Sequence, residues 1–452
     1  MITHNCFFDQ SQSKILKAFK ELQIGKFLRK SNITKSQGFS SLEIFKFIVL
    51  LIFHQKNLYR FLQSKYNESA FSKNTYYRFL NDSSSNWRKF LLYLSAFVVS
   101  HFSNLTCSKR VKTLVLDDSI YTRNRSKSVE LLARVYDHVS KKYQRGFSLL
   151  TLGWTDGQSF VPMAFNLLSS AKQHNCLCPM SSDTDRRSNG YRFRTDSLLP
   201  KTDAAIRLVQ SALDFGIQAQ YVLMDSWFTT EPFLQRLLDL GMHSIGMVKQ
   251  LKQRYFFQGK FYTLHQLKRF VSFHGNKNIF GSLLVTTKNG LLVKIVFVRN
   301  RNKRSECLYL LSTDCSVDDQ EVVRIYGNRW SIECFFKCAK SFLGLGKEFQ
   351  SRNYGALVFH TTIVFTRYIL LEWVRRHQCD MKTYGELFFM FCDDIQDMTL
   401  FEALRSLMAL FVKHISASES EIQFVLKSKV CDWIASQAPY IKLLFANLSW
   451  ES

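Results

Sequence analysis

Between residues 110 and 248, short apolar runs of strand length alternate with turn and helix signals. VKTLVLDD at 111–118 is followed by GFSLLTLGW and SFVPMAFNLL, which are joined by a turn at Asp156 and Gly157. A helical stretch at about 201–214 leads to QYVLMD, and a second helix near PFLQRLLDLG leads to HSIGMVK. Short apolar runs bounded by turn residues predict β-strands. The pattern therefore predicts three strands followed by an alternation of helices and strands.

This order is that of a ribonuclease H-like α/β core. We predict that residues 109–249 and 306–378 form such a catalytic core. Residues 250–305 interrupt it with short β-like runs, many cations and the turns GNKN and KNG, so they predict a β-rich insertion subdomain. Residues 169–200 are rich in Asn, Ser, Asp and Arg, which predicts an exposed loop.

The two ends of the chain have apolar residues at helical spacing. Residues 1–108 predict a helical, DNA-binding region, and residues 379–452 predict a helical C-terminal region. Ser72 is placed to cap a short helix. This segment has two equally good explanations. It is either part of a plain helical bundle or a DNA-contacting surface made by Lys73, Tyr76, Tyr77 and Arg78.

The charge of the chain favours a polyanionic partner. Lysine and arginine total 61 against 36 acidic residues, a net charge of +25, and the cations are spread along the whole length. Phosphate neutralisation and counterion release drive nucleic-acid binding, so double-stranded DNA is the expected partner. The alternative is a basic surface with no partner.

No feature predicts secretion or a membrane anchor. The eleven cysteines include no Cys-x-x-Cys pair, which favours free thiols in a reducing cytoplasm. The N-terminus has no apolar signal segment. Residues 354–374 are long enough to cross a membrane, but they include His360, Arg367 and Glu372, so we predict a buried core helix.

Four carboxylates occupy positions suited to metal-dependent phosphoryl transfer. Asp117 and Asp118 end the first predicted core strand, Asp225 ends the fourth, and Glu333 lies on the helix after the insertion. Two hard cations about 3.5 to 4 Å apart need carboxylates from separate elements. A single strand-end aspartate more often caps a loop, but these residues in this order predict a Mg²⁺ site.

The segment IYGNRWSIECFFKCAK, at 325–340, predicts one amphipathic helix. At 100° per residue, one stripe of this helix carries a phenol, cations and a carboxylate: Tyr326, Arg329, Glu333, Lys337 and Lys340. The cations are suited to hold the phosphates that flank a scissile bond. A solvated stripe with Arg329–Glu333 pairing is the alternative.

The spacing of Tyr326, Arg329, Glu333 and Lys340 resembles that of a known family. Bacterial insertion-sequence transposases of the DDE type carry the signature Tyr-x2-Arg-x3-Glu-x6-Lys, the YREK signature, which these residues fit without a gap. The Asp-x-Ser at 117–119 and the strand-ending aspartate add to the resemblance, which covers about residues 110 to 375.

The resemblance implies a site, an activity and a partner. Asp225 and Glu333 would be metal ligands with either Asp117 or Asp118, using Mg²⁺ with Mn²⁺ as a substitute, and Tyr326, Arg329 and Lys340 would grip the DNA backbone. Such enzymes cut DNA at the terminal inverted repeats of their own element and join the 3′-hydroxyls to a target. They act as dimers on DNA, which places this chain in the bacterial cytoplasm at the nucleoid.

One feature leaves the cleavage route open. Relatives that make hairpin ends stack a flipped base on aromatic residues, including a tryptophan of the insertion, but here no tryptophan lies between Trp227 and Trp330. Either other aromatics substitute or they form the core of the insertion: Tyr255, Phe256, Phe257 and Tyr262.

We therefore predict a Mg²⁺-dependent DNA transposase in which activated water and then the 3′-hydroxyl attack phosphorus. A ribonuclease H-like nuclease that cleaves without joining is the first alternative. The second is a non-catalytic DNA-binding protein descended from a transposase.

Overall fold

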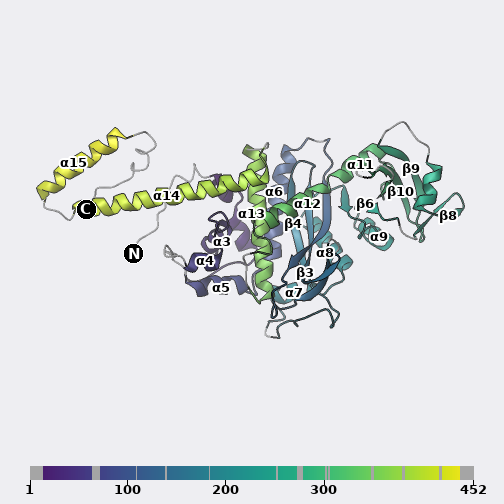
Figure 1. Ribbon diagram of the computed structural model, residues 1–452, viewed down its shortest axis with the longest axis horizontal. Coiled ribbons are helices and arrows are strands. Elements are labelled where there is room, and N and C mark those ends of the chain that lie inside the picture. The colour runs from purple at the N-terminus through teal and green to yellow at the C-terminus, as the bar shows by residue number, and fades with distance from the viewer. Residues whose placement is uncertain are drawn as a thin grey trace.

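The computed structural model describes residues 14–63, 72–107, 109–137, 140–182, 184–250, 253–271, 278–300, 303, 306–347, 351–378, 382–416 and 420–437. A large mixed sheet flanked by helices extends from the middle of the molecule to its right-hand end (Figure 1). The α/β class predicted from the sequence is confirmed.

The core of the sheet is centred on β1 (Thr113–Thr122). β1 pairs antiparallel with β3 (Lys142–Thr155) on one side and parallel with β5 (Tyr221–Met224) on the other. β6 (His243–Val248) continues parallel beyond β5, and β4 (Phe160–Leu168) pairs with the outer side of β3. This spatial order is consistent with a ribonuclease H-like core.

The strands of the insertion extend the same sheet. β11 (Cys307–Ser312) pairs antiparallel with β6, so the sheet continues through it without a break. The remaining strands follow beyond β11 in the order β10 (Leu292–Arg299), β9 (Ile279–Thr286), β7 (Arg254–Phe257) and β8 (Lys260–Thr263). Two short turns of helix, α10 (Leu264–Leu267) and η1 (Lys268–Phe270), follow β8.

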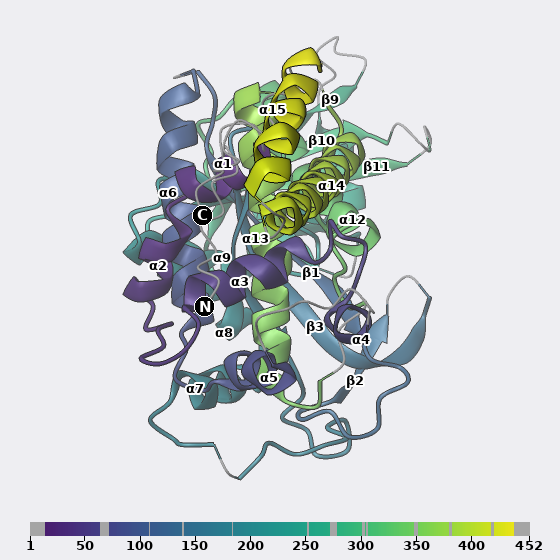
Figure 2. The ribbon, with the colours of Figure 1, turned by 90° about the vertical axis from the view of Figure 1, so that its left-hand side faces the viewer.

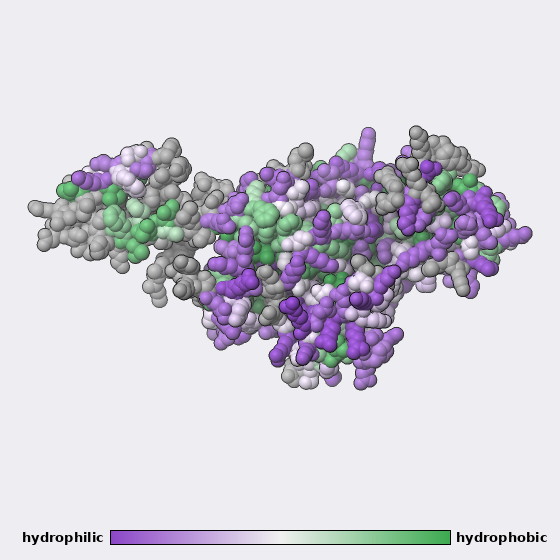
Figure 3. All heavy atoms as spheres, in the orientation of Figure 1, coloured by the Kyte–Doolittle hydropathy of each residue, from purple (hydrophilic) through white to green (hydrophobic). Residues whose placement is uncertain are grey.

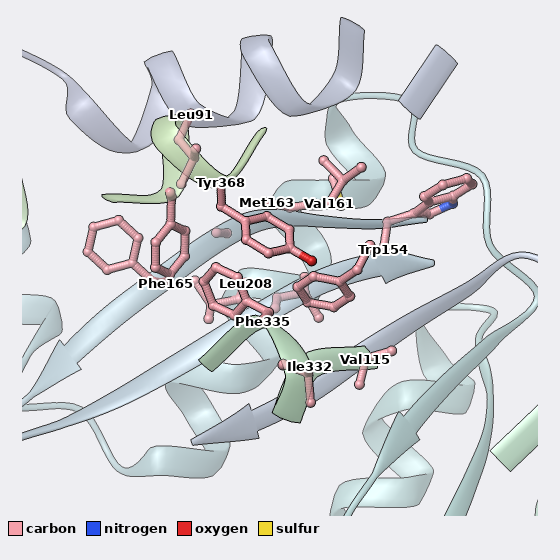
Figure 4. Close-up of a cluster of buried hydrophobic side chains, with 14 of the residues drawn as sticks. Leu91, Val115, Trp154, Val161, Met163, Phe165, Leu208, Ile332, Phe335 and Tyr368 are labelled. Carbon is pink, nitrogen blue, oxygen red and sulfur yellow. The ribbon is translucent and has the colours of Figure 1, made fainter. Parts of the chain in front are cut away.

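The helix that follows the insertion packs onto the core sheet. α12 (Trp330–Ser341) lies between β1 and α13 (Tyr354–Gln378). Phe335 of α12 meets Phe160 of β4 at 5.4 Å and Tyr368 of α13 at 4.9 Å between ring centroids. Figure 4 shows this cluster, with Ile332 next to Val115 of β1. Burial of large rings on both sides fixes the orientation of α12.

α13 is a buried helix of the core, as predicted. It is the one helix among the described residues that is long and apolar enough to cross a membrane, and 94% of its most apolar window is buried. Its buried charged side chains have partners within the protein, as buried charges require. The Arg367 guanidinium donates to the carbonyl oxygens of Ile48, Val49 and Leu343, and Glu372 pairs with Arg375.

The described part of the N-terminal region forms six helices (Figures 1 and 2): α1 (Lys14–Glu21), α2 (Ile24–Lys30), α3 (Ser41–Leu50), α4 (Leu58–Gln63), α5 (Lys73–Asn81) and α6 (Trp87–Leu105). Helices α1, α3, α5 and α6 contact α13, and α6 also contacts the sheet through β4. Ser72 caps α5, accepting from the Thr75 N–H at 3.3 Å. Tyr76 is fully buried, so it cannot contact DNA as one reading of the sequence required. Lys73 and Arg78 are exposed.

The C-terminal helices form an arm. α14 (Tyr384–Ser416) and α15 (Ser420–Ser436) extend from the body side by side (Figure 1). Large apolar side chains are exposed along these two helices: Phe389, Leu404, Leu407, Leu410, Phe411, Val425 and Trp433. Figure 3 shows hydrophobic surface on the arm.

Two local predictions are wrong. Residues 169–200 are not a continuous loop, because Asn189–Asp196 form α7, capped by Ser188, whose hydroxyl accepts from the Tyr191 N–H. The strand containing Asp117 does not end there but continues to Thr122. This extension pairs with the start of β3, which also pairs with a strand not predicted, β2 (Ala133–Asp137). The polar composition of these segments conceals regular structure that tertiary pairing supports.

A buried ion pair connects α7, the loop that carries Glu130 and the start of α13. Arg194 of α7 donates from Nε and Nη2 to the Glu130 carboxylate at 2.6 and 2.8 Å. The Tyr354 N–H, at the start of α13, and the Ser181 N–H donate to the same carboxylate at 2.9 Å each. Although burial opposes it, these hydrogen bonds hold the pKa of Glu130 below its usual value.

We expect Arg194→Met to lower the free energy of unfolding by about 3 to 5 kcal/mol, because it leaves Glu130 buried without its charge partner. Arg207→Met is the matched control: its exposed pair with Asp196 contributes at most about 1 kcal/mol. Urea unfolding measures both. Because the pKa of Glu130 is lowered in the folded protein, ionised Glu130 contributes to the free energy of unfolding at pH values above the usual glutamate pKa. This contribution is lost as the pH falls through the pKa that Glu130 has in the folded protein. Equal losses in the two variants would contradict this role.

Candidate active site

The two neighbouring aspartates of β1 point to opposite faces of the sheet. β1 pairs with β5 only as far as Leu116, so Asp117 is the first residue beyond the parallel pairing. Asp225 follows β5 directly. Because the carboxyl ends of parallel neighbours meet at one edge, Asp117 and Asp225 lie close together, as the rise that Asp225 causes in the Asp117 pKa indicates.

The continuous helix predicted over 325–340 is wrong. α11 (Asp319–Gly327) ends before α12 begins, and Asn328 and Arg329 form the joint between them. Glycine and asparagine are weak helix formers, which favours a break at this position. Tyr326 therefore comes from α11, whereas Glu333 and Lys340 come from α12.

Arg329 connects two of the predicted catalytic carboxylates. Its Nη1 donates to Asp117 Oδ2 at 3.0 Å, and its Nη2 donates to Glu333 Oε1. The guanidinium also lies 5.9 Å from the centre of the Tyr326 ring. Only 16% of the Arg329 side chain is exposed. One cation thus holds a carboxylate of a strand and a carboxylate of a helix that lie 216 residues apart in the sequence, at positions 117 and 333.

Lys340 lies on the same face of β1. Its Nζ donates to Ser119 Oγ at 2.6 Å, and Ser119 is two residues from Asp117, so both side chains point toward α12. Burial lowers the pKa of Lys340, and the charge of Asp137 opposes this effect. Lys337, by contrast, is exposed on α12.

Asp118 belongs to the other face. It accepts from Ser148 Oγ at 2.7 Å and from Lys201 Nζ at 2.9 Å, where α8 (Lys201–Asp214) begins. The Lys201 ammonium lies 4.3 Å from the centre of the Trp227 ring, and the Trp227 N–H donates to Asp225 Oδ1 at 3.0 Å. Asp118 therefore contacts the loop after Asp225 through Lys201.

The site is a partly buried cluster of carboxylates around a cation. Burial raises the pKa of Asp117 to about 7; the charges of Asp225 and Asp118 add to this rise, and Arg329 opposes it. Within the described residues, no three His, Cys, Asp or Glu side chains stand close enough together to hold a metal ion. The carboxylate oxygens are nevertheless the donor type that Mg²⁺ prefers.

Two exposed tryptophans next to this cluster were missed. Trp330 is 64% exposed and lies between Arg329 and Glu333 in the chain, and Trp227 is 39% exposed two residues after Asp225. Their positions in the sequence, close to Arg329 and Asp225, could have identified them as candidate site residues. An exposed indole can stack on a base.

The aromatic residues of the insertion differ in whether they are buried in its core or exposed enough to stack on a base. Tyr255 is fully buried, which agrees with the alternative that it forms part of the core of the insertion. Phe257 and Tyr262 pack against Phe270, with centroids 5.5 and 5.1 Å apart. Phe256 remains 41% exposed.

Two family models match the chain. Residues 43–260 match the model for a DDE superfamily endonuclease, and residues 201–370 match the model for a transposase DDE domain. No curated protein matches the chain. The two family matches support a DDE-superfamily transposase or endonuclease, and they indicate a nuclease-type enzyme. DDE transposase domains generally use divalent metal ions.

The raised pKa of Asp117 predicts that its ionisation destabilises the metal-free protein. The destabilisation is absent below the ordinary aspartate pKa and complete above about pH 7, because the unfolded chain loses this proton first. Asp117→Asn keeps an acceptor for Arg329 without the charge. We expect this variant to melt about 2 to 5 °C above wild type at about pH 8 in a chelating buffer, with a smaller gain at about pH 5. Asp118→Asn loses its pair with Lys201 and removes only the weakest of the charges that raise the pKa of Asp117, so its gain should be smaller than that of Asp117→Asn. A variant melting at or below wild type at the higher pH would contradict the prediction.

Proposed function

We propose that this protein is a DNA transposase that binds the terminal inverted repeats of its insertion sequence, cleaves the ends and joins the 3′-hydroxyls to target DNA. The observation that carries the proposal is Arg329, which brings Asp117 and Glu333 together next to Asp225. A carboxylate cluster with a resident cation suits a reaction in which negative charge develops on phosphoryl oxygens. The spacing of the motif around Arg329 supports the YREK family.

Asp117, Asp225 and Glu333 are the residues that would hold Mg²⁺, with Mn²⁺ as a substitute. When bound, the divalent cations supply an activated nucleophile and neutralise charge on the phosphoryl group. Asp117 is the better candidate of the two neighbouring aspartates because it shares the face of Glu333. Asp118 acts as a positioning residue through Lys201 and the Trp227 loop.

The cations of the site are proposed to hold the DNA backbone. Lys340 lies on the face of α12 that carries Glu333, and Arg329 lies in the joint just before this helix. From these positions the two cations can contact phosphates on either side of the scissile bond. Tyr326 supports Arg329 through its ring, and Lys337 adds an exposed charge. Trp330 is placed to stack on a base near the cut.

The wider assembly follows from the same proposal. Residues 1–108 would contribute DNA binding, and the catalytic core, the insertion at 250–305 and the C-terminal region at 379–452 would act as separate parts of one enzyme. Two protomers would pair the two ends in the bacterial cytoplasm. The exposed apolar residues of α14 and α15 favour a second copy of the chain as their partner, because a monomer rarely exposes so many large apolar side chains on one element.

Loss of any one of the three carboxylates should abolish cleavage. We expect Asp117→Asn, Asp225→Asn and Glu333→Gln each to lower single-turnover nicking of inverted-repeat DNA by at least about a thousandfold, while DNA affinity changes less than about threefold. Asp118→Asn is the neighbouring control and should stay within about tenfold of wild type. The assignment fails if Asp118→Asn alone removes activity.

A joining assay with the wild-type protein decides between a transposase and a nuclease that cleaves DNA without joining it. A pre-cut end with a free 3′-hydroxyl, incubated with wild type and a target plasmid, should yield joined product. Nicking without any joined product would assign the protein to the nuclease class.

A further inference from the structure

A hairpin that the proposed site does not use projects from the end of the sheet. It is made by β2 and the first residues of β3, with Arg134 opposite Arg145 and Tyr136 opposite Tyr143. Side chains alternate between the two faces of a strand, so these four residues share one face, which we call the outer face of the hairpin. All four are exposed. The outer face is therefore an accessible surface of two arginines and two tyrosines.

The pairing of the two arginines is unfavourable unless an anion lies near them. Like charges placed directly across two strands destabilise a hairpin. In the part of the chain that the structure describes, neither guanidinium has a carboxylate partner. Both line a pocket of about 310 Å³ with Tyr143, Gln144 and Asn175. An arginine pair with no internal counter-charge is suited to bind an external anion.

The charge extends beyond this pocket. A second pocket of about 250 Å³ shares Arg145 and adds Lys127, with Ser126, Leu132 and Leu177 as its other lining residues. The one acidic residue between Arg123 and Asp137, Glu130, is buried in its pair with Arg194. Consecutive anion sites along one surface suit a polyanion better than a single small anion.

The tyrosines indicate the chemistry of this polyanion. The two rings meet edge to face, with centroids 5.2 Å apart and planes at 67°. Tyr143 is nevertheless 69% exposed. Exposed aromatic rings beside arginines are typical of nucleic-acid surfaces, where rings pack on sugars or bases and hydroxyl groups donate to phosphates. An acidic protein would provide the charge but would not account for the ring.

The hairpin lies next to the proposed active site. Asp137 accepts from Gln144 Nε2 at 2.7 Å and is near enough to act electrostatically on Lys340. Lys340 in turn contacts Ser119, two residues from Asp117. A duplex held at Lys340 therefore reaches the hairpin when it continues past the end of α12.

We propose that the outer face of the β2–β3 hairpin binds the phosphate backbone of the duplex being cut, on the Lys340 side of the scissile bond. Arg134 and Arg145 each contact a phosphate, and Tyr143 packs on the intervening sugar and donates its hydroxyl group. This inference rests on the proposed function, because it requires DNA at the carboxylate cluster. It adds a second, non-catalytic contact that lengthens the bound segment.

The test measures the affinity of the full-length Glu333→Gln protein for a fluorescein-labelled duplex of about 30 base pairs over a range of KCl concentrations. Each phosphate neutralised contributes about 0.9 to the slope of log K against log salt. We expect Arg134→Ala/Arg145→Ala to lower this slope by about 1.8 and the affinity roughly tenfold or more. Arg207→Ala/Arg236→Ala is the matched control: it removes the same charge from two arginines that are neutralised by Asp196 and Asp203, and its slope should not change.

A second variant separates binding from folding. Arg134→Glu places opposite charges across the strands, which favours the hairpin but removes the anion site, so it should bind DNA as weakly as the double variant while melting no lower than the Glu333→Gln parent. Wild-type slope and affinity in both hairpin variants would overturn this inference and leave the proposed function intact. If the parent itself does not bind duplex DNA, the proposed function fails and the inference fails with it.

Discussion

The arrangement of the site depends on the contacts that the Arg329 guanidinium makes with two carboxylates. This arginine lies at the joint between α11 and α12 and connects Asp117 of β1 with Glu333 of α12. Arg329 stands directly before the first residue of α12, so its side chain and that of Glu333 are one helical turn apart. The pair is partly buried, where an unpaired carboxylate would be costly, so the joint, the strand and the helix are constrained together.

The sheet and α13 pack against α12 and so support the joint that precedes it. Phe335 packs between Phe160 and Tyr368, which holds α12 between the sheet and α13. Arg367 of α13 binds the Leu343 carbonyl oxygen just after α12 ends and also binds two carbonyl oxygens of the N-terminal region. Side chains carried by elements packed on both sides keep their positions better than side chains on loops. The buried polar residues of α13 therefore contribute to the geometry of the site.

The sequence predicts the parts of this structure that depend on local pattern. Apolar runs identify β1, β3, β4, β5 and β6, and the spacing around Glu333 identifies α12 and its charged neighbours. What it cannot predict depends on tertiary pairing. The helical stripe gives no sign of the break at Asn328, and Asp117 and Asp118 are equivalent until the alternation of β1 assigns them to opposite faces. The β2–β3 hairpin was missed because polar residues fill one face of it.

The central proposal is that Asp117, Asp225 and Glu333 would hold a divalent cation beside Arg329. Fe²⁺ substituted for Mg²⁺, with ascorbate and peroxide, generates hydroxyl radicals that cut the polypeptide next to the ion. Mass spectrometry of the fragments then locates the site without any assay of activity. The account predicts cuts clustered near residues 117, 225 and 333, suppressed by excess Mg²⁺ and lost in Asp225→Asn. Cuts that cluster elsewhere in the chain, or that persist unchanged in Asp225→Asn, would contradict it.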